Sequence, residues 1–408
     1  MSHSPNLKLG RTTSVDHHAD LQVLTRIRKF LLPKAFSVSP ALLHEMNEGY
    51  GIADPLADAL LTEGNKFYQP LIQELAPNLL KSKNRSVIPN LLNHTNYLAL
   101  CEQFATHPKW YDPKLAEVGA IAYRRYPLML IWLLRNVALM AGYSIPALSL
   151  PLIKTGALVH DALPRLMRTY AYILAVSEHP ALNGHSKVLA IGSEGWRQSI
   201  LVRQIHGMVR LGLQKDGWDA DYWGVPVNQT DMVATHLQFS LLIMRGLKLL
   251  GAKISEEESQ GILHLWMLAS WWLGVDLSRL PSTEQDCWVW LYTYLATQKL
   301  DFEVGKPLAK ALHDLPSQIM GEENKKGQFV ELVNASVTRT LVGDDIGDGL
   351  GLPKTRWRHG VLVSVPLLFG MDTARQYNQN VAQRLEAFRS KRQDNMNWWL
   401  KQHDAYYQ

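Results

Sequence analysis

Residues 231–300 read DMVATHLQFSLLIMRGLKLLGAKISEEESQGILHLWMLASWWLGVDLSRLPSTEQDCWVWLYTYLATQKL, and this stretch decides the fold class. Its apolar residues recur at helical spacing over 231–250, 255–274 and 283–300. The middle run opens with Ser255 followed by three glutamates, which is an N-cap with acids in the first turn. We therefore expect three long helices in succession.

Helical signals continue on both sides of this stretch. Asp54 followed by Pro55 is an N-cap acid with proline at the first helical position. Alternating strand patterns are nearly absent, apart from a short extended piece at 187–191, and the glycines of 343–357 predict a loop. Further helices are predicted over 21–32, 97–105, 128–140, 166–177, 309–315, 329–340 and 373–402.

The composition is that of a globular protein. The chain has 408 residues, of which 47% are hydrophobic and 19% charged. No internal repeat, low-complexity stretch or Pro/Gly/Ser-rich linker divides it. We predict an all-α fold with a flexible N-terminal tail over residues 1–20 and a single helical domain over 21–408. The 13 tryptophans are interpreted as filling for a large helical core.

Charge and cysteine content exclude several classes of function. The net charge is +5, and no run reaches the five or six like charges of a nucleic-acid-binding arm. Two cysteines, Cys101 and Cys287, cannot form a disulfide framework or a Cys-rich zinc site. Zinc, phosphate-loop and serine-hydrolase motifs are missing as well. The first 20 residues are polar and lack the apolar core of a secretory signal, so we expect a cytoplasmic protein.

One apolar stretch, residues 127–153, is long enough to cross a bilayer. However, Arg135 would cost about 2.5–3.5 kcal/mol near the middle of a membrane. Gly142, Pro146 and Pro151 would also break a spanning helix. We predict a buried helix followed by a broken apolar connection. Its apolar face leaves peripheral membrane contact, or entry of an apolar substrate, as open alternatives.

The segment VRQIHGMVR, residues 202–210, carries the first candidate site. On a helix, Arg203, His206 and Arg210 fall at i, i+3 and i+7, on one face. An imidazole between two guanidinium groups suits an anionic iron macrocycle such as haem, because the imidazole can ligate iron while the arginines pair with carboxylates. The alternative is a hydrogen-bonded histidine of the core.

A second polar cluster precedes it. Arg165, Arg168 and Thr169 fall at i, i+3 and i+4, and Asp161 lies one turn earlier, where it can pair with Arg165. These residues form either an exposed basic turn or the polar side of a haem pocket, where hydrogen-bond donors decide whether dioxygen is held or activated.

A third polar stripe lies in the segment 226–240. Asn228 or Thr230 can cap the helix that follows, and Asp231, Thr235 and Gln238 continue along one face of it. We interpret this stripe as capping the helix and pairing with arginines of a neighbouring helix.

Together, four short motifs resemble one known family. RLMRT (165–169), VRQIHGMVR (202–210), VPVNQTD (225–231) and WLGVD (272–276) resemble the rubber oxygenases, or latex-clearing proteins, which are grouped with endoplasmic-reticulum-bound oxygenases of mycophenolic acid synthesis. The likeness covers roughly residues 110–300. It implies an all-α fold with a globin-like core that holds one b-type haem, with His206 as proximal iron ligand. It also implies insertion of dioxygen across an isoprenoid C=C bond.

Two departures from the family pattern affect the expected substrate. Arg168 stands where rubber oxygenases have lysine, and the family's distal glutamate has no counterpart, since no glutamate occurs between Glu117 and Glu178. No secretory signal is seen. We therefore expect a smaller isoprenoid or lipid than solid polyisoprene.

The resulting hypothesis is a haem b-dependent oxygenase that uses dioxygen on an apolar unsaturated molecule. His206 would bind iron, Arg203 or Arg210 would meet the haem carboxylates, and Arg165, Arg168 and Thr169 would shape the dioxygen side. Two rivals stay open: a haem-binding protein without oxygenase activity, and a non-haem helical scaffold that binds lipid or an acidic partner. The sequence does not determine the oligomeric state.

Overall fold

The computed structural model describes residues 9–12, 37–77, 91–155, 162–180, 184–299, 301–356, 359–385, 387, 391 and 400. Within these ranges the chain is helical, and the one β pairing is an isolated bridge between Thr12 and Gln298. The all-α prediction is confirmed. The predicted helix over 21–32 lies outside the described residues.

The α-helices are α2 (Pro40–Tyr50), α3 (Pro55–Thr62), α4 (Tyr68–Leu75), α5 (Thr95–Ala105), α6 (Pro113–Arg124), α7 (Pro127–Leu133), α8 (Met140–Tyr143), α9 (Pro146–Lys154), α10 (Ala162–Val176), α11 (Glu194–Lys215), α12 (Ala220–Trp223), α13 (Gln229–Leu237), α14 (Ile243–Leu249), α15 (Glu256–Trp272), α16 (Glu284–Thr297), α17 (Phe302–His313), α18 (Leu315–Met320), α19 (Lys325–Leu341), α20 (Asp344–Gly349) and α21 (Ser364–Tyr377). Two π-helical segments, η2 (Leu134–Leu139) and η4 (Gln238–Leu242), and two short 3₁₀ segments, η5 (Leu277–Arg279) and η6 (Gly360–Val363), complete the set.

The helix starts follow the capping signals of the sequence. Asp54 Oδ1 accepts from the Ala57 amide at 3.3 Å, with Pro55 at the first position of α3. Ser255 and Glu258 form a reciprocal capping box at the start of α15. These local hydrogen bonds satisfy amides that have no partner within the helix.

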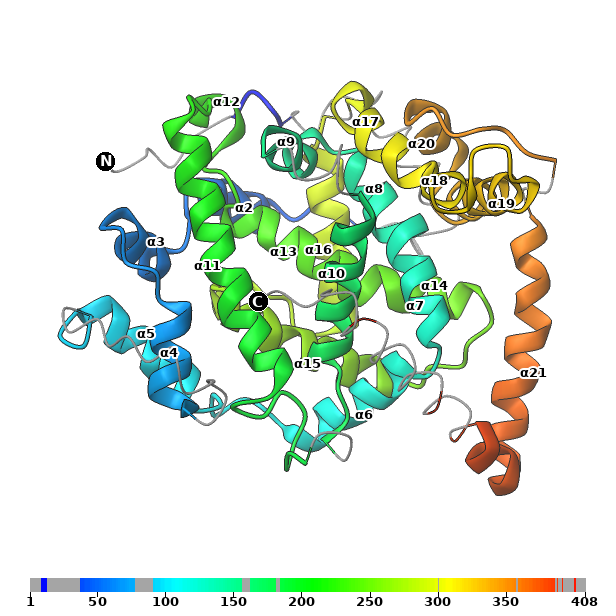
Figure 1. The fold of residues 1–408 in the computed structure, drawn as a ribbon, viewed down its shortest axis with the longest axis horizontal. Helices are drawn as coiled ribbons and strands as arrows, with labels where there is room; N and C mark the ends of the chain where they lie inside the picture. The colour runs from blue at the N-terminus through cyan, green and yellow to red at the C-terminus, as the bar shows by residue number, and fades with distance from the viewer. Residues whose placement is uncertain are drawn as a thin grey trace.

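The long helices pack around a shared centre (Figure 1). Helices α10, α11, α13, α15 and α16 fill the middle, α3–α5 lie on one side, and α17–α20 lie on the other with α21 at the edge. One close crossing joins α6 to α15, where a Cβ on Gly119 would overlap the backbone of Gly261. Glycine at both positions is therefore required for this close approach.

Two predicted helices contain π-helical turns. The run 231–250 forms α13, η4 and α14 in succession, and the run 128–140 forms α7, η2 and the start of α8. The two π segments, η2 and η4, contact each other in the interior. Since π turns inside α-helices are frequent at functional sites, this contact draws attention to the space beside it.

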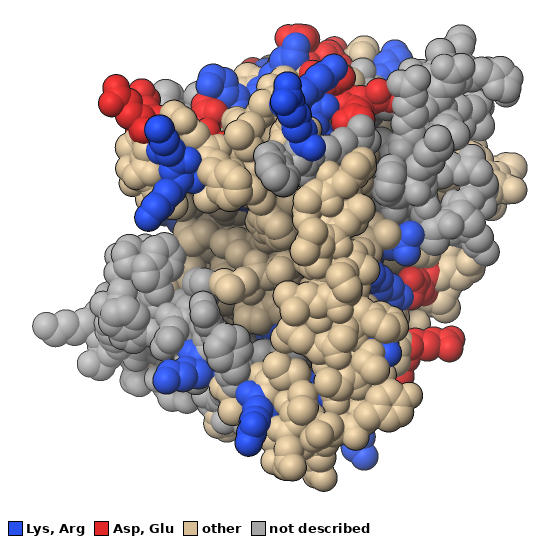
Figure 2. Space-filling model, turned by 90° about the vertical axis from the view of Figure 1, so that its right-hand side faces the viewer, with Lys and Arg blue, Asp and Glu red and all other residues tan. Residues whose placement is uncertain are grey.

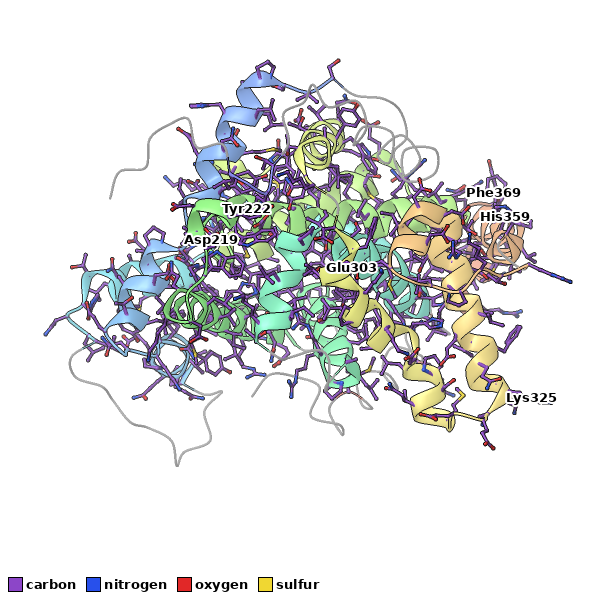
Figure 3. The ribbon with its side chains drawn as sticks, turned by 90° about the horizontal axis from the view of Figure 1, so that it is seen from above. Asp219, Tyr222, Glu303, Lys325, His359 and Phe369 are labelled. Carbon is purple, nitrogen blue, oxygen red and sulfur yellow. The ribbon has the colours of Figure 1, made fainter. Side chains whose placement is uncertain are left out.

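The prediction of a flexible tail is wrong for residues 9–12. Leu9 and Arg11 are 2% and 3% exposed, and Arg11 pairs with Asp231, more than 200 residues away. Tyr222 of α12, which is labelled in Figure 3, lies against Gly10. Local sequence signals cannot predict this packing, because both partners lie far along the chain.

Three further local predictions need correction. The Gly-rich segment 343–357 contains helix α20, because the buried Arg339 donates to Asp348 Oδ1 at 2.7 Å and to the Pro353 carbonyl at 2.9 Å. Residues 187–191 form turns and bends rather than an extended strand. The apolar connection after residue 145 forms helix α9, whose Pro146 takes the tolerated first position.

The apolar stretch 127–153 is largely buried in the protein. Arg135 is 7% exposed and donates to the Leu312 and His313 carbonyls at the end of α17, which explains a charge inside an apolar segment. In the described part of the chain, no single helix is long and apolar enough to span a membrane. The pair Pro113–Arg124 and Pro127–Tyr143, bent by 81°, meets that criterion together by length and composition.

One face of the molecule is mostly uncharged and hollowed, with lysine and arginine side chains toward its margin (Figure 2). Exposed apolar side chains of η6 and α21 include Val363, Leu367 and Phe369. Figure 3 shows Phe369 and His359 at one edge of the molecule and Lys325 at the beginning of α19.

Candidate functional site

A cavity of about 380 Å³ opens between α8, α9, α10, α11, α13 and the π segment η4, a volume typical of small-molecule sites. Most of its wall is aliphatic, and its polar side chains come from five separate helical runs. The polar wall residues are Tyr143, Thr155, Arg165, Arg168, Thr169, His206, Asp231, Thr235 and Gln238. Both π segments border it, through Leu139 and Gln238.

His206 lies in the wall of this cavity, on the 22-residue helix α11. Val202, Ile205 and Val209 line the cavity from the same helix. Burial, together with the charges of Arg210 and Arg165, lowers the pKa of His206 to about 4. The imidazole is therefore neutral at physiological pH and has a nitrogen lone pair available.

The second ring nitrogen of His206 is also informative. Nδ1 is buried and has no hydrogen-bond partner in the described structure. A buried imidazole nitrogen without a partner costs free energy, and among the described residues Nδ1 lacks the hydrogen bond that the core-histidine alternative requires.

Arg203 and Arg210, in contrast, do not line the cavity. Arg203 donates to both oxygens of Asp54, at 2.7 and 2.9 Å, and to Gln103 Oε1 at 2.8 Å. Arg210 pairs with Asp58 and donates to the Val227 carbonyl at 3.1 Å. The structure therefore turns both arginines toward α3, and the expected pairing with haem carboxylates does not follow from their positions.

The partner carboxylates explain how two guanidinium groups can be buried on α11. Burial alone would raise the pKa of Asp54, but the Arg203 guanidinium holds it below its usual value. Arg203 is 2% exposed, so the pair is a fully buried charge-assisted hydrogen bond. These carboxylates come from α3, about 150 residues earlier, and spacing within α11 could not reveal them.

Arg165, Arg168 and Thr169 do line the cavity, from α10. Arg165 is half-buried, whereas Arg168 is exposed. After burial, which is the larger influence on each group, the Arg165 charge acts to lower the pKa of both His206 and Tyr143. The Thr169 hydroxyl donates to the Arg165 carbonyl at 3.0 Å, so its proton is committed to the helix backbone. The structure brings this predicted cluster together with His206. Asp161 lies outside the described residues.

Tyr143 was missed by the sequence analysis. Burial raises its pKa to about 12, although Arg165 and Arg135 act in the opposite direction, so the phenol keeps its proton at neutral pH. It lies at the end of α8 after the π segment η2, and its position in the cavity depends on that turn. A helix assumed to be regular would not have placed it there.

Asp231 also borders the cavity, but its oxygens are engaged. Arg11 donates to Oδ2 and Oδ1 at 2.8 and 2.6 Å, Tyr294 to Oδ1 at 2.9 Å and Asn228 to Oδ2 at 2.7 Å. The stripe predicted to pair with arginines of a neighbouring helix pairs with Arg11 of the N-terminal segment instead. This carboxylate fixes structure and is not a free base.

Residues 123–370 relate the chain to a known family. A family model described as ER-bound oxygenase mpaB/B′/Rubber oxygenase, catalytic domain, matches residues 123–370, more than half of the chain. The chain belongs to this family. The matched region contains the cavity and His206, and it confirms the resemblance inferred from the four motifs.

Two individual proteins are similar to this chain at low sequence identity. The Rubber oxygenase of Streptomyces sp. (strain K30) is 26% identical over 160 residues, which is 38% of this chain and 38% of that protein. The solved structure of Latex Clearing Protein LCP in the closed state superposes with a TM-score of 0.57 and 17% identity, covering 89% of this chain and 94% of that one. The second likeness shows a shared fold.

Proposed function

We propose that this protein is a haem b-dependent oxygenase that inserts dioxygen into a C=C bond of an isoprenoid or another apolar unsaturated molecule. The observation that carries the proposal is a neutral imidazole, His206, in the wall of an apolar cavity and close enough to Arg165 for that charge to lower its pKa. Membership of an oxygenase family supports it.

The residues present fit a haem. The neutral His206 matches the nitrogen ligand that haem iron takes from proteins. Arg165 and Arg168 are cations of the cavity wall that suit negative charge on the dioxygen side. The spacing of Arg203 and Arg210 suggested that they pair with the haem carboxylates, but Asp54 and Asp58 already bind these two arginines.

A bound haem would supply the redox-active iron for dioxygen chemistry. The chain's own groups would set its surroundings. Tyr143 keeps a donor proton, Arg165 contributes positive charge from a half-buried position, and the aliphatic wall excludes water and holds a hydrocarbon chain. Thr169, bonded to the backbone, fixes the polar edge of α10.

The cavity bears on the substrate as well. Among the described lining residues, Asp231 is the single carboxylate, and its oxygens already accept hydrogen bonds from three side chains. The described part of this wall therefore offers no free carboxylate base, which agrees with the missing distal glutamate. A compact isoprenoid or lipid alkene suits the enclosed, aliphatic space.

The test is aerobic turnover of a panel of isoprenoids and unsaturated lipids by haem-loaded protein, with ¹⁸O₂ to trace oxygen into carbonyl products. Arg165→Ala is expected to bind haem normally and to lose most of its turnover, with partial rescue by Arg165→Lys. The exposed Arg356, outside the cavity wall, gives the matched control Arg356→Ala, which should behave as wild type.

The outcomes separate the rival functions. Full haem occupancy without labelled product from any substrate would favour a haem-binding protein. Failure to bind haem at all would favour a scaffold for lipid or a partner. An unchanged rate in Arg165→Ala would remove Arg165 from the reaction.

A further inference from the structure

A second, smaller cavity of about 30 Å³ lies behind the first. It is enclosed by α8, α13, α16 and the π segment η4, and most of its lining side chains are buried. One water needs about 10–15 Å³ of such space, so the inner cavity can hold a small diatomic molecule. Its lining residues are Ala141, Ser144, Ile145, Ala234, Gln238, Leu242, Leu291, Tyr294, Leu295 and Val342.

The chemistry of this inner cavity favours an apolar occupant. The Ser144 hydroxyl donates to the Ala141 carbonyl at 2.6 Å, and the Tyr294 hydroxyl donates to Asp231 at 2.9 Å. Both hydroxyl protons are therefore used within the protein. A buried water typically makes two to four hydrogen bonds, and the Gln238 amide is the remaining polar side chain of this wall.

Gln238 is the one described residue that lines both cavities. It lies in η4 against Gly142 of α8, where a Cβ would come within 3.1 Å of the amide oxygen and 3.2 Å of the amide nitrogen. Because Gly142 has no side chain, the Gln238 amide can pack against α8 at this position.

We propose that the inner cavity is a holding site for dioxygen and that Gln238 is the gate through which dioxygen passes to the main cavity. This inference rests on the proposed function, in which dioxygen is the co-substrate. Dioxygen is an apolar gas, so an apolar pocket next to the reaction space would retain it.

The first test is xenon, a probe of apolar gas sites, in pressurised crystals of the full-length protein. Xenon is expected in the inner cavity of the wild type. Ala234→Leu places a larger side chain in that wall and should remove the xenon site. Ala374→Leu on the exposed side of α21 makes the same exchange outside both cavities and should leave xenon in place.

The second test measures dioxygen association with the ferrous, haem-loaded protein after flash photolysis of its carbon monoxide form. Ala234→Leu should slow association severalfold. Gly142→Ala, which presses on the Gln238 amide, should also slow it, and Gln238→Ala should accelerate it. If Ala234→Leu does not fold, Gly142→Ala and Gln238→Ala still test whether Gln238 controls the passage of dioxygen.

Absence of xenon from the wild-type inner cavity would overturn the holding site. Equal association rates in wild type, Gly142→Ala and Gln238→Ala would overturn the gate. A protein that binds xenon there but takes up no haem would retain the gas site while the proposed function fails, so the two failures are distinguishable.

Discussion

Two pairs of arginines on neighbouring helices differ in what they contact. Arg203 and Arg210 on α11 are buried and bound to Asp54 and Asp58 of α3, whereas Arg165 and Arg168 on α10 line the cavity. Arg203 and Arg210 are seven residues apart and Arg165 and Arg168 are three apart, and both spacings put a pair on one face of its helix, so spacing alone does not separate them. What differs is the neighbour: α3 supplies carboxylates to α11, and an aliphatic cavity faces α10.

The comparison shows how narrow a functional helix face can be. At about 100° per residue, Val202, Ile205 and Val209 centre on the cavity, and His206 lies at the border of that face. The arginines lie just past the border, where they meet protein carboxylates. Two charges on the same helix as His206 are thus paired with protein carboxylates. The following predictions test that division.

The largest effect is expected for Arg203→Met. It leaves the Asp54 carboxylate buried without its partner, which costs about 3–5 kcal/mol of unfolding free energy. Denaturant unfolding measures the loss. The double variant Arg203→Met/Asp54→Leu removes the orphaned charge and should recover much of it. A stable Arg203→Met protein with impaired haem binding would return Arg203 to the cofactor site.

Acid should destabilise the protein next most strongly. Burial lowers the pKa of His206 to about 4 and that of His236 to about 3, below the ordinary value of 6.5. The unfolded chain binds these protons first, so stability is fully present above pH 6.5 and falls as the pH drops toward the folded-state values. One pKa unit corresponds to about 1.4 kcal/mol, so each histidine contributes a loss of a few kcal/mol at most.

The measurement is the free energy of unfolding between pH 7 and 4.5. Removing one histidine, in His206→Phe, should make the slope of stability against pH shallower than in wild type. Identical slopes would show that His206 is not held neutral by the fold.

A smaller effect is expected for Arg210→Met. Its partner Asp58 keeps 21% of its side chain exposed and can regain water, so the cost should be about 1–3 kcal/mol. Thermal and denaturant unfolding alongside Arg203→Met rank the two pairs. A larger loss than for Arg203→Met would reverse the order inferred from burial.

The smallest effect on stability is expected for Arg168→Ala. This side chain is exposed at the cavity, so the free energy of unfolding should change by no more than about 0.5 kcal/mol. A loss comparable to that of Arg203→Met would mean that the α10 pair is structural too, and the contrast between the two helices would disappear.

Much of the fold could be predicted because its signals are local. Asp54-Pro55 and Ser255 mark helix starts through hydrogen bonds that span three residues, and the helical periodicity located the long helices. The π turns at η2 and η4 could not be predicted, since interior packing rather than local pattern sets them. They place Tyr143 and Gln238 in the cavity wall.

The site was predicted in part for the same reason. His206, Arg165, Arg168 and Thr169 lie in short motifs, and the structure brings them to one cavity. The groups that bind Arg203 and Asp231 are Asp54 and Arg11, and both lie far away in the sequence. Long-range pairing decides which charged side chains are available to a ligand.

The most direct test of the site is the absorption spectrum of protein purified with haem supplied, quantified as pyridine haemochrome. A Soret band with about one haem b per chain is expected for the wild type, as a single axial histidine implies. His206→Ala should lose it, while the exposed His359→Ala control should keep it. Full occupancy in His206→Ala, or no haem in the wild type, would contradict the assignment of His206 as the iron ligand.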